Sequence, residues 1–292
     1  MSSQSVISDL VTYLNKRDFL NSSLQDDSRH PIFINGDRVN ASYANIEMDT
    51  LFQPVFNITK NTVAGHEAFL SVQTPSGVKS IGKMLSPQAL FFLPSETSGI
   101  SYLDRLARTL HALNFLVQEN TGLLHLNVHP NHLLAVDKNH GQFFEGVLRQ
   151  CGIAPEQIVL EVIEYAVTER RKLSAAIQAW KEKGYRIAID NFGRAHSNVE
   201  RLTKLNPHVV KIDRSYFVSL LSYPGLIATL KNTIQRGRDV NIEWVAAGIE
   251  TQEQLDLAVQ LGVDYVQGYY LGTPSPVCHP HGIALQKKCA QV

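Results

Sequence analysis

Gly184-Tyr-Arg-Ile-Ala-Ile-Asp-Asn-Phe-Gly193 is the stretch that decides the fold. Within it, residues 187–189 form a short apolar run that ends at Asp190, and the final glycine indicates a turn. Residues 173–180 precede the stretch with apolar side chains at helical spacing, and the first glycine is typical of a helix end. The order helix, glycine, apolar strand and carboxylate predicts a buried strand that places an acid at its own C-terminal end.

The same alternation of helical and strand patterns recurs from residue 51 to residue 267. Strands that alternate with helices predict a parallel sheet, and six to eight such units over roughly 235 residues predict a TIM-type barrel. An open doubly wound sheet would need a Gly-rich phosphate loop after a strand, and the sequence has none. Polar residues fall at the predicted strand ends, namely Glu67, Asn127, Glu161, Asp190, Lys211, Glu250 and Gln267.

These strand-end residues predict one site, because the C-terminal ends of barrel strands meet at one rim. Carboxylate and amide oxygens suit a hard cation, Mg²⁺ or Mn²⁺, better than zinc. A lysine beside them suits a phosphate or a water nucleophile. Each residue alone would be an ordinary solvated rim residue, and it is the recurrence at successive strand ends that favours a site.

The composition excludes several classes of function. Lys plus Arg and Asp plus Glu both number 27, so the formal net charge is +0, which predicts no binding to a nucleic acid polymer or to anionic lipid. No apolar run approaches the roughly 20 residues of a membrane helix, and the N-terminus lacks the pattern of a signal peptide. The 3 widely spaced cysteines fit reduced thiols of a cytosol. Cys278-His279-Pro280-His281 has metal-binding residue types but no fourth partner nearby, so a Pro-rich loop is favoured.

Residues 1–45 differ from the rest of the chain. Apolar residues between Val6 and Leu14 recur at helical spacing, and a polar stretch follows at residues 21–29, so we expect a helix and a loop. The segment is too short to fold alone, which leaves a strap packed on the main domain or a contact for a partner or second copy. The next predicted strand, residues 51–56, contains Pro54 and is therefore an edge strand or the entry strand of the barrel.

The chain resembles EAL domains, whose signature it follows in order in Gln53-Pro54-Val55, Glu67-Ala68-Phe69, Asn127, Glu161-Val-Ile-Glu164, Asp190-Asn-Phe-Gly193, Lys211-Ile-Asp213, Gly248-Ile-Glu250-Thr251 and Gln267-Gly-Tyr-Tyr270. The resemblance implies a modified TIM-like barrel with an antiparallel first strand, at residues 46–280, between an N-terminal helical extension at 1–45 and a tail at 281–292. It also implies a homodimeric signalling protein of the bacterial cytosol. Active members hydrolyse the second messenger cyclic di-GMP to linear pGpG with two Mg²⁺ or Mn²⁺ ions.

The resemblance implies a role for each matching residue. One metal ion would be held by Glu67, Asn127, Glu161 and Asp190. Cyclic di-GMP would contact Gln53, which meets a guanine, together with Pro54, Phe69, Lys211 and Gln267. Lys211 would also act beside the attacking water or scissile phosphate, with Glu250 as the second catalytic residue. Glu164 would anchor the loop after the Asp190 strand, which in the family couples dimerisation to metal binding.

Three departures from the family pattern affect the expected chemistry. Asn191 stands where active members have a second aspartate, a ligand of the second metal ion, and Ala247 stands where they have a glutamate. An amide lacks the charge that holds Mg²⁺ and acidifies water, and a methyl group cannot coordinate metal. Ser71 replaces an arginine, which removes a contact to phosphate or guanine.

The leading hypothesis is a degenerate EAL domain that binds cyclic di-GMP, with at most one ion, or acts through contacts with a protein partner. The first alternative is a weak metal-dependent phosphodiesterase. The second is an interaction module that binds no nucleotide. Restoring carboxylates at Asn191 and Ala247 discriminates the first two, because each catalytic ion contributes several kcal/mol to such a reaction.

Overall fold

The computed structural model describes residues 3–16, 31–73, 86–119, 122–135, 142–167, 169–194 and 199–280. Its helices are α1 (Ser3–Lys16), α2 (Pro87–Leu90), α3 (Thr97–Val117), α4 (Pro130–Ala135), α5 (Gln142–Gln150), α6 (Arg170–Glu182), α7 (Val199–Leu205), α8 (Arg214–Ser222), α9 (Gly225–Arg238) and α10 (Gln252–Leu261), with short 3-10 helices η1 (Pro155–Gln157) and η2 (Glu164–Ala166). Its strands are β1 (Ile32–Asn35), β2 (Arg38–Tyr43), β3 (Ile46–Asn57), β4 (Thr62–Gln73), β5 (Leu123–Val128), β6 (Ile158–Ile163), β7 (Arg186–Phe192), β8 (Val209–Ile212), β9 (Glu243–Ala247) and β10 (Tyr265–Gln267).

The strands form one 10-stranded sheet in the order β1-β2-β3-β10-β9-β8-β7-β6-β5-β4, and an additional β3–β4 pairing closes β3 to β10 into a barrel. Strand β3 is antiparallel to both of its barrel neighbours, β4 and β10. The pairings from β4 through β10 are parallel. The predicted TIM-like barrel with an antiparallel first strand is therefore confirmed, and the strand with Pro54 is the entry strand of the barrel.

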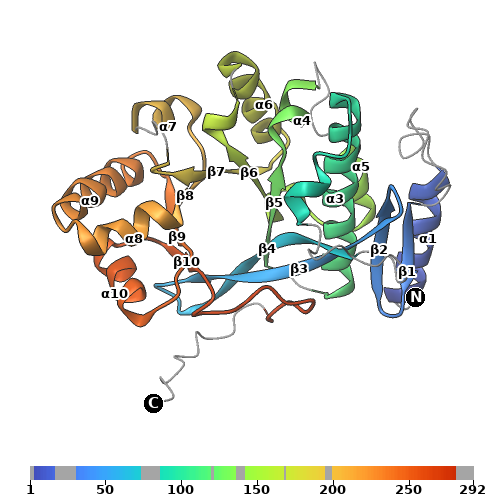
Figure 1. The fold of residues 1–292 in the computed structure, drawn as a ribbon, viewed down its shortest axis with the longest axis horizontal. Helices are drawn as coiled ribbons and strands as arrows, with labels where there is room; N and C mark the ends of the chain where they lie inside the picture. Colours follow the sequence, from blue (N-terminus) through green and yellow to red (C-terminus); the bar gives the residue numbers. More distant parts are fainter. Residues whose placement is uncertain are drawn as a thin grey trace.

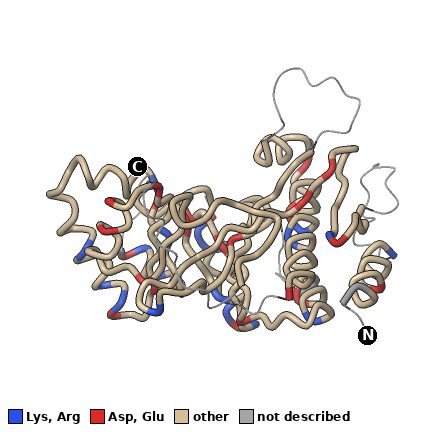
Figure 2. The backbone as a smooth tube through the Cα atoms, turned by 90° about the horizontal axis from the view of Figure 1, so that it is seen from below, with Lys and Arg blue, Asp and Glu red and all other residues tan. Residues whose placement is uncertain are grey.

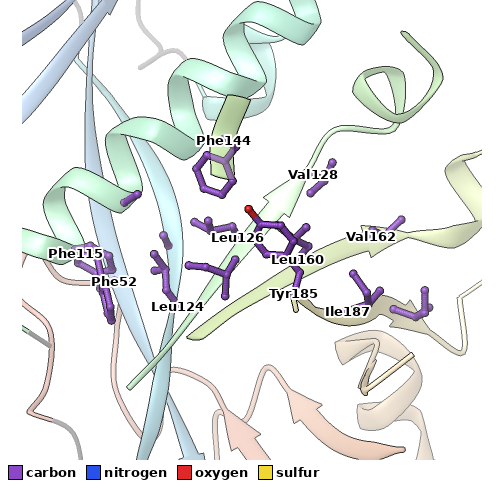
Figure 3. Close-up of a cluster of buried hydrophobic side chains, with 14 of the residues drawn as sticks. Phe52, Phe115, Leu124, Leu126, Val128, Phe144, Leu160, Val162, Tyr185 and Ile187 are labelled. Carbon is purple, nitrogen blue, oxygen red and sulfur yellow. The ribbon is translucent and has the colours of Figure 1, made fainter. Parts of the chain in front are cut away.

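Helices α6 to α10 surround one side of the barrel, and α3 covers the side next to α1, β1 and β2 (Figure 1). The main core lies between strands and helices because strand side chains alternate in direction. Leu124 and Leu126 of β5 and Leu160 of β6 point outward toward Phe115 of α3 and Phe144 of α5 (Figure 3). Full burial of such side chains contributes about 2 kcal/mol each, so this layer fixes the strands that present the site.

The N-terminal segment differs in part from its prediction. Helix α1 is present and buries Ile7, Leu10 and Leu14, so it is a strap packed on the main domain. The expected loop at residues 21–29 lies outside the described residues. Strands β1 and β2 were not expected. Strand β2 pairs with β3, so the sheet continues through the boundary predicted between residues 45 and 46. The missed signal was Gly36-Asp37, the two residues between Asn35 and its partner Arg38, because a Gly-Asp pair between short alternating runs is typical of a hairpin turn.

Asn15 of α1 protects the outer edge of this sheet. Its Nδ2 donates to the Ile32 carbonyl at 2.7 Å, and its Oδ1 accepts from the Ile32 backbone N–H at 3.2 Å. A free strand edge is a template for unwanted pairing, and the carboxamide satisfies one peptide of that edge. The helix and the hairpin are therefore joined by polar contacts as well as by burial.

The stretch that decides the fold forms β7, and Gly193 ends it with φ at +95°. A Cβ atom at Gly193 would lie 2.1 Å from Cδ1 of Tyr216, so the turn requires glycine for both reasons. Along the whole described chain, positive and negative residues are interspersed (Figure 2). No helix among the described residues has the length and apolar character needed to cross a membrane.

Candidate functional site

The barrel interior is built in two layers. The lower layer is apolar and consists of Val159, Ala188, Val209 and Val245. Two residues further along the same strands, β6 to β9, the next inward-facing layer consists of Glu161, Asp190, Lys211 and Ala247. Because strand side chains alternate with a period of two, the polar layer lies directly above an apolar plug at the C-terminal mouth.

Lys211 is the centre of the polar layer and is only 3% exposed. Its Nζ donates to Oε2 of Glu67 at 2.6 Å and to Oε2 of Glu161 at 2.7 Å. Oε1 of Glu161 also lies 2.8 Å from Nδ1 of His125, within hydrogen-bond distance. Burial, followed by repulsion from Lys211, lowers the pKa of His125 to about 3, so this imidazole is neutral and adds no charge.

Three amide side chains complete the network around Glu67. Asn127 Nδ2 donates to Glu67 Oε1 at 2.9 Å, and Gln267 Nε2 donates to Glu67 Oε2 at 2.9 Å. Gln267 Nε2 also donates to Gln53 Oε1 at 3.1 Å, while Gln53 Nε2 donates to the Gly272 carbonyl at 2.9 Å. Residues from β3, β4, β5 and β10 therefore meet at one carboxylate.

The site has more carboxylates than cations. Burial alone would raise the pKa of Glu67, but Lys211 and the hydrogen bonds from Lys211, Asn127 and Gln267 hold it below its usual value. Burial and repulsion from Glu67 raise the pKa of Glu161 to about 8 despite Lys211. Burial also raises the pKa of Asp190 to about 7, against the attraction of Lys211 and with repulsion from the other two carboxylates. One ammonium group offsets only part of this negative charge.

The donor set fits a divalent cation, because carboxylate and amide oxygens are the ligands of Mg²⁺ and Mn²⁺. An ion would add the positive charge that the raised pKa values of Glu161 and Asp190 show to be lacking. In the described residues no three His, Cys, Asp or Glu side chains are already arranged around one point, and Lys211 lies between Glu67 and Glu161. Ion binding would therefore require movement of these side chains relative to Lys211.

Of the three departures from the family pattern, Asn191 and Ala247 line the same mouth, and Ser71 is not among its lining residues. A register shift between β7 and β8 after Ile189 and a φ of +58° at Asn191 let adjacent residues Asp190 and Asn191 both face the cavity. Asn191 Nδ2 donates to Asp190 Oδ2 at 3.1 Å. A carboxylate cannot make that bond, so the amide stabilises Asp190 where a second aspartate would repel it.

A cavity of about 400 Å³ occupies the mouth. The predicted residues that line it are Gln53, Glu67, Phe69, Asp190, Lys211, Glu250 and Gln267, together with Asn191 and Ala247. Asn127 and Glu161 are connected to these lining residues by their hydrogen bonds with Glu67 and Lys211, respectively. Pro54 is not among the described lining residues and packs against Gly272, and Glu164 is bonded to Arg201 of α7. Helix α7 begins after residues 195–198, which lie outside the described part, so an anchoring role of Glu164 for that loop stays a prediction.

Sequence reasoning missed two contributors. His125 could have been found from alternation, because it is two residues before Asn127 and must share its inward face. Arg214 follows the Lys211 strand directly, and its NH2 donates to Glu250 Oε2 at 2.6 Å across the mouth. Residue spacing gave no sign of that pair, because its two members come from different strand ends. The Cys278 and His279 tract takes part in no metal cluster within the described residues, and His281 lies outside them.

Comparison with known proteins identifies the family. The family described as EAL domain matches residues 37–274. The chain belongs to the EAL domain family.

This EAL domain is similar to proteins from several bacteria. It is 30% identical over 153 residues to the probable cyclic di-GMP phosphodiesterase PdeA of Escherichia coli K12, covering 52% of this chain and 21% of PdeA. It is 27% identical over 231 residues to YkuI of Bacillus subtilis 168, an uncharacterized EAL-domain containing protein, covering 77% of this chain and 54% of YkuI. The chain therefore spans about half the length of these relatives or less.

Solved structures of EAL proteins superpose on this chain. The structure of YkuI with substrate cyclic di-GMP and calcium gives a TM-score of 0.68 at 25% identity, covering 82% of this chain and 59% of that one. BlrP1 of Klebsiella pneumoniae, solved with manganese and cyclic di-GMP, gives a TM-score of 0.66 at 22% identity, covering 78% of this chain and 56% of that one. At the latter identity the likeness shows the fold alone, and both solved relatives contain a divalent cation.

Proposed function

We propose that this EAL domain binds cyclic di-GMP at the barrel mouth and transmits its presence without cleaving it efficiently. The observation that carries the proposal is the content of one cavity. Glu67, Asp190 and Lys211 line it together with Asn191 and Ala247. The residues for holding a ligand and one cation are present, whereas two positions for a second cation have no carboxylate.

The energetic argument concerns the second ion. In two-metal phosphodiester cleavage, each ion stabilises developing charge by several kcal/mol, and about 1.4 kcal/mol corresponds to a factor of ten in rate. Asn191 brings an amide that is already bonded to Asp190, and Ala247 brings a methyl group. The expected loss is therefore several powers of ten relative to a domain with both carboxylates.

The remaining residues have distinct roles in this proposal. Glu67, Asn127, Glu161 and Asp190 would hold one Mg²⁺ or Mn²⁺ ion, which would supply positive charge for a bound phosphate. Lys211 provides a second positive charge and fixes the oxygens of Glu67 and Glu161 through two hydrogen bonds. The nucleotide would be oriented by Gln53, Pro54, Phe69, Lys211 and Gln267, with Glu250 at the rim.

Ligand binding at the site would act by changing a contact with another protein. We place the chain in the bacterial cytoplasm, as a homodimer that acts on a protein partner. Glu164, which is 8% exposed, bonds to Arg201 of α7, and this contact would carry a change near Asp190 to the outer helices. Neither a nucleic acid polymer nor membrane insertion is part of the proposal.

A weak phosphodiesterase is the second candidate. It is favoured by the complete network of Glu67, Glu161 and Lys211, which holds acid and ammonium groups 2.6 and 2.7 Å apart. An amide oxygen at Asn191 can also coordinate a metal ion, although without charge. Under this alternative the wild-type chain would release pGpG with Mn²⁺ at a rate that added carboxylates barely improve.

Calorimetric titration of cyclic di-GMP, with Mg²⁺ and then with EDTA, tests the proposal. Chromatography of the solution taken from the calorimeter cell after the titration shows whether the cyclic di-GMP is intact. We expect saturable binding, intact nucleotide and weaker binding in EDTA. Recovery of pGpG on the time scale of the titration would contradict the proposal in favour of the enzyme, and absence of heat in both arms would leave only an interaction module.

A further inference from the structure

A second cavity lies outside the barrel wall, next to the mouth. Its volume is about 360 Å³, and we call it the lateral pocket; its lining includes Phe69, Phe91, Arg108, His111, Asn127 and His129. Ala68 and Leu70 of β4 also line it, and these two alternate with the inward-facing Glu67. The lateral pocket therefore lies between the outer face of β4 and β5 and the helices α2 and α3, and among the described lining residues it shares only Phe69 with the mouth cavity.

The walls of the lateral pocket are flat and apolar. The rings of Phe91 and His129 are stacked, with centroids 5.1 Å apart and an interplanar angle of 9°. Phe92 is 86% exposed at the rim, while Ala107 lies on the α3 side. Aromatic rings beside a largely apolar space favour a planar ligand.

The charged groups of the lateral pocket are already paired with each other. Arg108 donates from NH2 to Asp104 Oδ2 at 2.6 Å and from Nε to the same oxygen at 3.1 Å. The other oxygen of Asp104 accepts from the His129 backbone N–H at 2.8 Å. A charged ligand would therefore lose its hydration without gaining a free counter-charge, which favours a neutral one.

His111 supplies a hydrogen-bond donor. It is 6% exposed, and its Nδ1 lies 2.8 Å from Oγ1 of Thr50. Thr50 is fully buried, Asn114 donates to its oxygen at 3.3 Å, and among the described residues its hydroxyl hydrogen has no acceptor other than His111 Nδ1. We therefore assign that hydrogen to His111 Nδ1, because a buried hydroxyl hydrogen without an acceptor is costly. The proton of the imidazole is then on Nε2, which has no partner among the described residues.

His129 supplies a second donor by the same reasoning. Its Nδ1 accepts from the Asn131 backbone N–H at 3.1 Å, which leaves the ring proton on Nε2. The ring of His129 is neutral because its Nδ1 accepts a hydrogen bond and therefore carries no proton. Burial lowers the pKa of His111 to about 3, so that ring is neutral as well. The lateral pocket thus combines flat apolar walls, no free charge and two N–H donors.

We infer that the lateral pocket is a binding site for a small, neutral, flat heteroaromatic ring that presents a hydrogen-bond acceptor, the class to which nucleobases belong. The ring would lie against Phe91 and His129, and its acceptor atom would receive the Nε2–H of His111. This site is distinct from the mouth and does not depend on cyclic di-GMP binding there.

Two probes of similar size test the inference on the full chain. Isoquinoline has a ring nitrogen acceptor, whereas indole has only a donor. Fragment-sized ligands reach a Kd of about 1 mM, so we expect that value for isoquinoline in an NMR titration. Indole should bind about tenfold more weakly, because it leaves the His111 N–H without an acceptor.

Three variants locate the binding. His111→Phe keeps the ring but removes the donor, and it should abolish the difference between the two probes. Ala107→Leu should fill the pocket and weaken both probes at least about tenfold, while Ala228→Leu, on the exposed face of α9, should change neither. If Ala107→Leu does not fold, Gln88→Trp at the exposed rim is the alternative block. No saturable isoquinoline binding, or binding that these changes leave intact, would overturn the inference.

Discussion

The two halves of the barrel mouth differ in how they balance charge. In one half, Glu67 and Glu161 are buried and share the ammonium group of Lys211 at 2.6 and 2.7 Å. In the other half, Asn191 stabilises Asp190 with an N–H bond, and Ala247 adds no polar atom. The first half needs cations to offset its two carboxylates, whereas Asp190 is the only carboxylate among the three residues named in the second half. The fold and the cavity of this EAL domain are thus compatible with an amide at position 191 and a methyl group at position 247.

Removal of Lys211 should give the largest change in stability. Lys211→Met leaves two buried carboxylates without their ammonium group, and loss of one partner of a buried pair costs about 3 kcal/mol or more. Urea unfolding at pH 8 should show that loss, and Mn²⁺ should recover part of it in the variant. Lys231→Met on the exposed face of α9 should stay within about 0.5 kcal/mol of wild type. A Lys211→Met protein as stable as wild type would show that the first half is not held by this charge.

Addition of a negative charge to the second half of the mouth should have an intermediate effect on stability. Ala247→Glu places a further carboxylate in the layer of Glu161 and Asp190, and we expect it to lower the free energy of unfolding by about 2 kcal/mol without metal. Ala247→Gln has the same shape without charge and is the matched control. Unfolding with and without Mn²⁺ measures both. The difference in the free energy of unfolding between the Glu and Gln variants should shrink when Mn²⁺ is added. A difference that Mn²⁺ leaves unchanged would contradict a metal role for this position.

Substitution of Asn191 should have the smallest effect on stability. Asn191→Asp exchanges a hydrogen-bond donor for a like charge beside Asp190, at an expected cost of about 1 kcal/mol in thermal unfolding without metal. Asn241 also has a positive φ, 63° against 58° at Asn191, and it is exposed, so Asn241→Asp measures the backbone cost alone. Equal losses in the two variants would mean that the bond to Asp190 contributes nothing.

The strand-end pattern predicted most of the barrel and its polar layer. The strand-end positions of Glu161, Asp190 and Lys211 were sufficient there, because the C-terminal ends of barrel strands meet at one rim. The hairpin of β1 and β2 was missed although Gly36-Asp37 is a typical turn pair, because its strands are too short for periodicity to stand out. Contacts between distant segments, such as that of Arg214 with Glu250, could not be predicted, because they depend on how the strand ends are arranged in space.

The lateral pocket was also beyond sequence reasoning, for a related physical reason. Its donors depend on a chain of bonds from Asn114 through Thr50 to His111. The three residues come from β3 and from two turns of α3, and each alone resembles an ordinary buried polar residue. Tautomers and cavities of this kind follow from packing rather than from local pattern.

The central claim is that two missing carboxylates limit catalysis, and turnover of cyclic di-GMP by wild type and by the Asn191→Asp, Ala247→Glu double variant tests it most directly. With Mn²⁺ and chromatography of pGpG, we predict that the double variant is at least about 10³-fold faster, the effect of several kcal/mol at the transition state. Glu67→Gln in the same background should remove the gain. If wild type already cleaves as fast as the double variant, the account of the second half of the mouth is wrong.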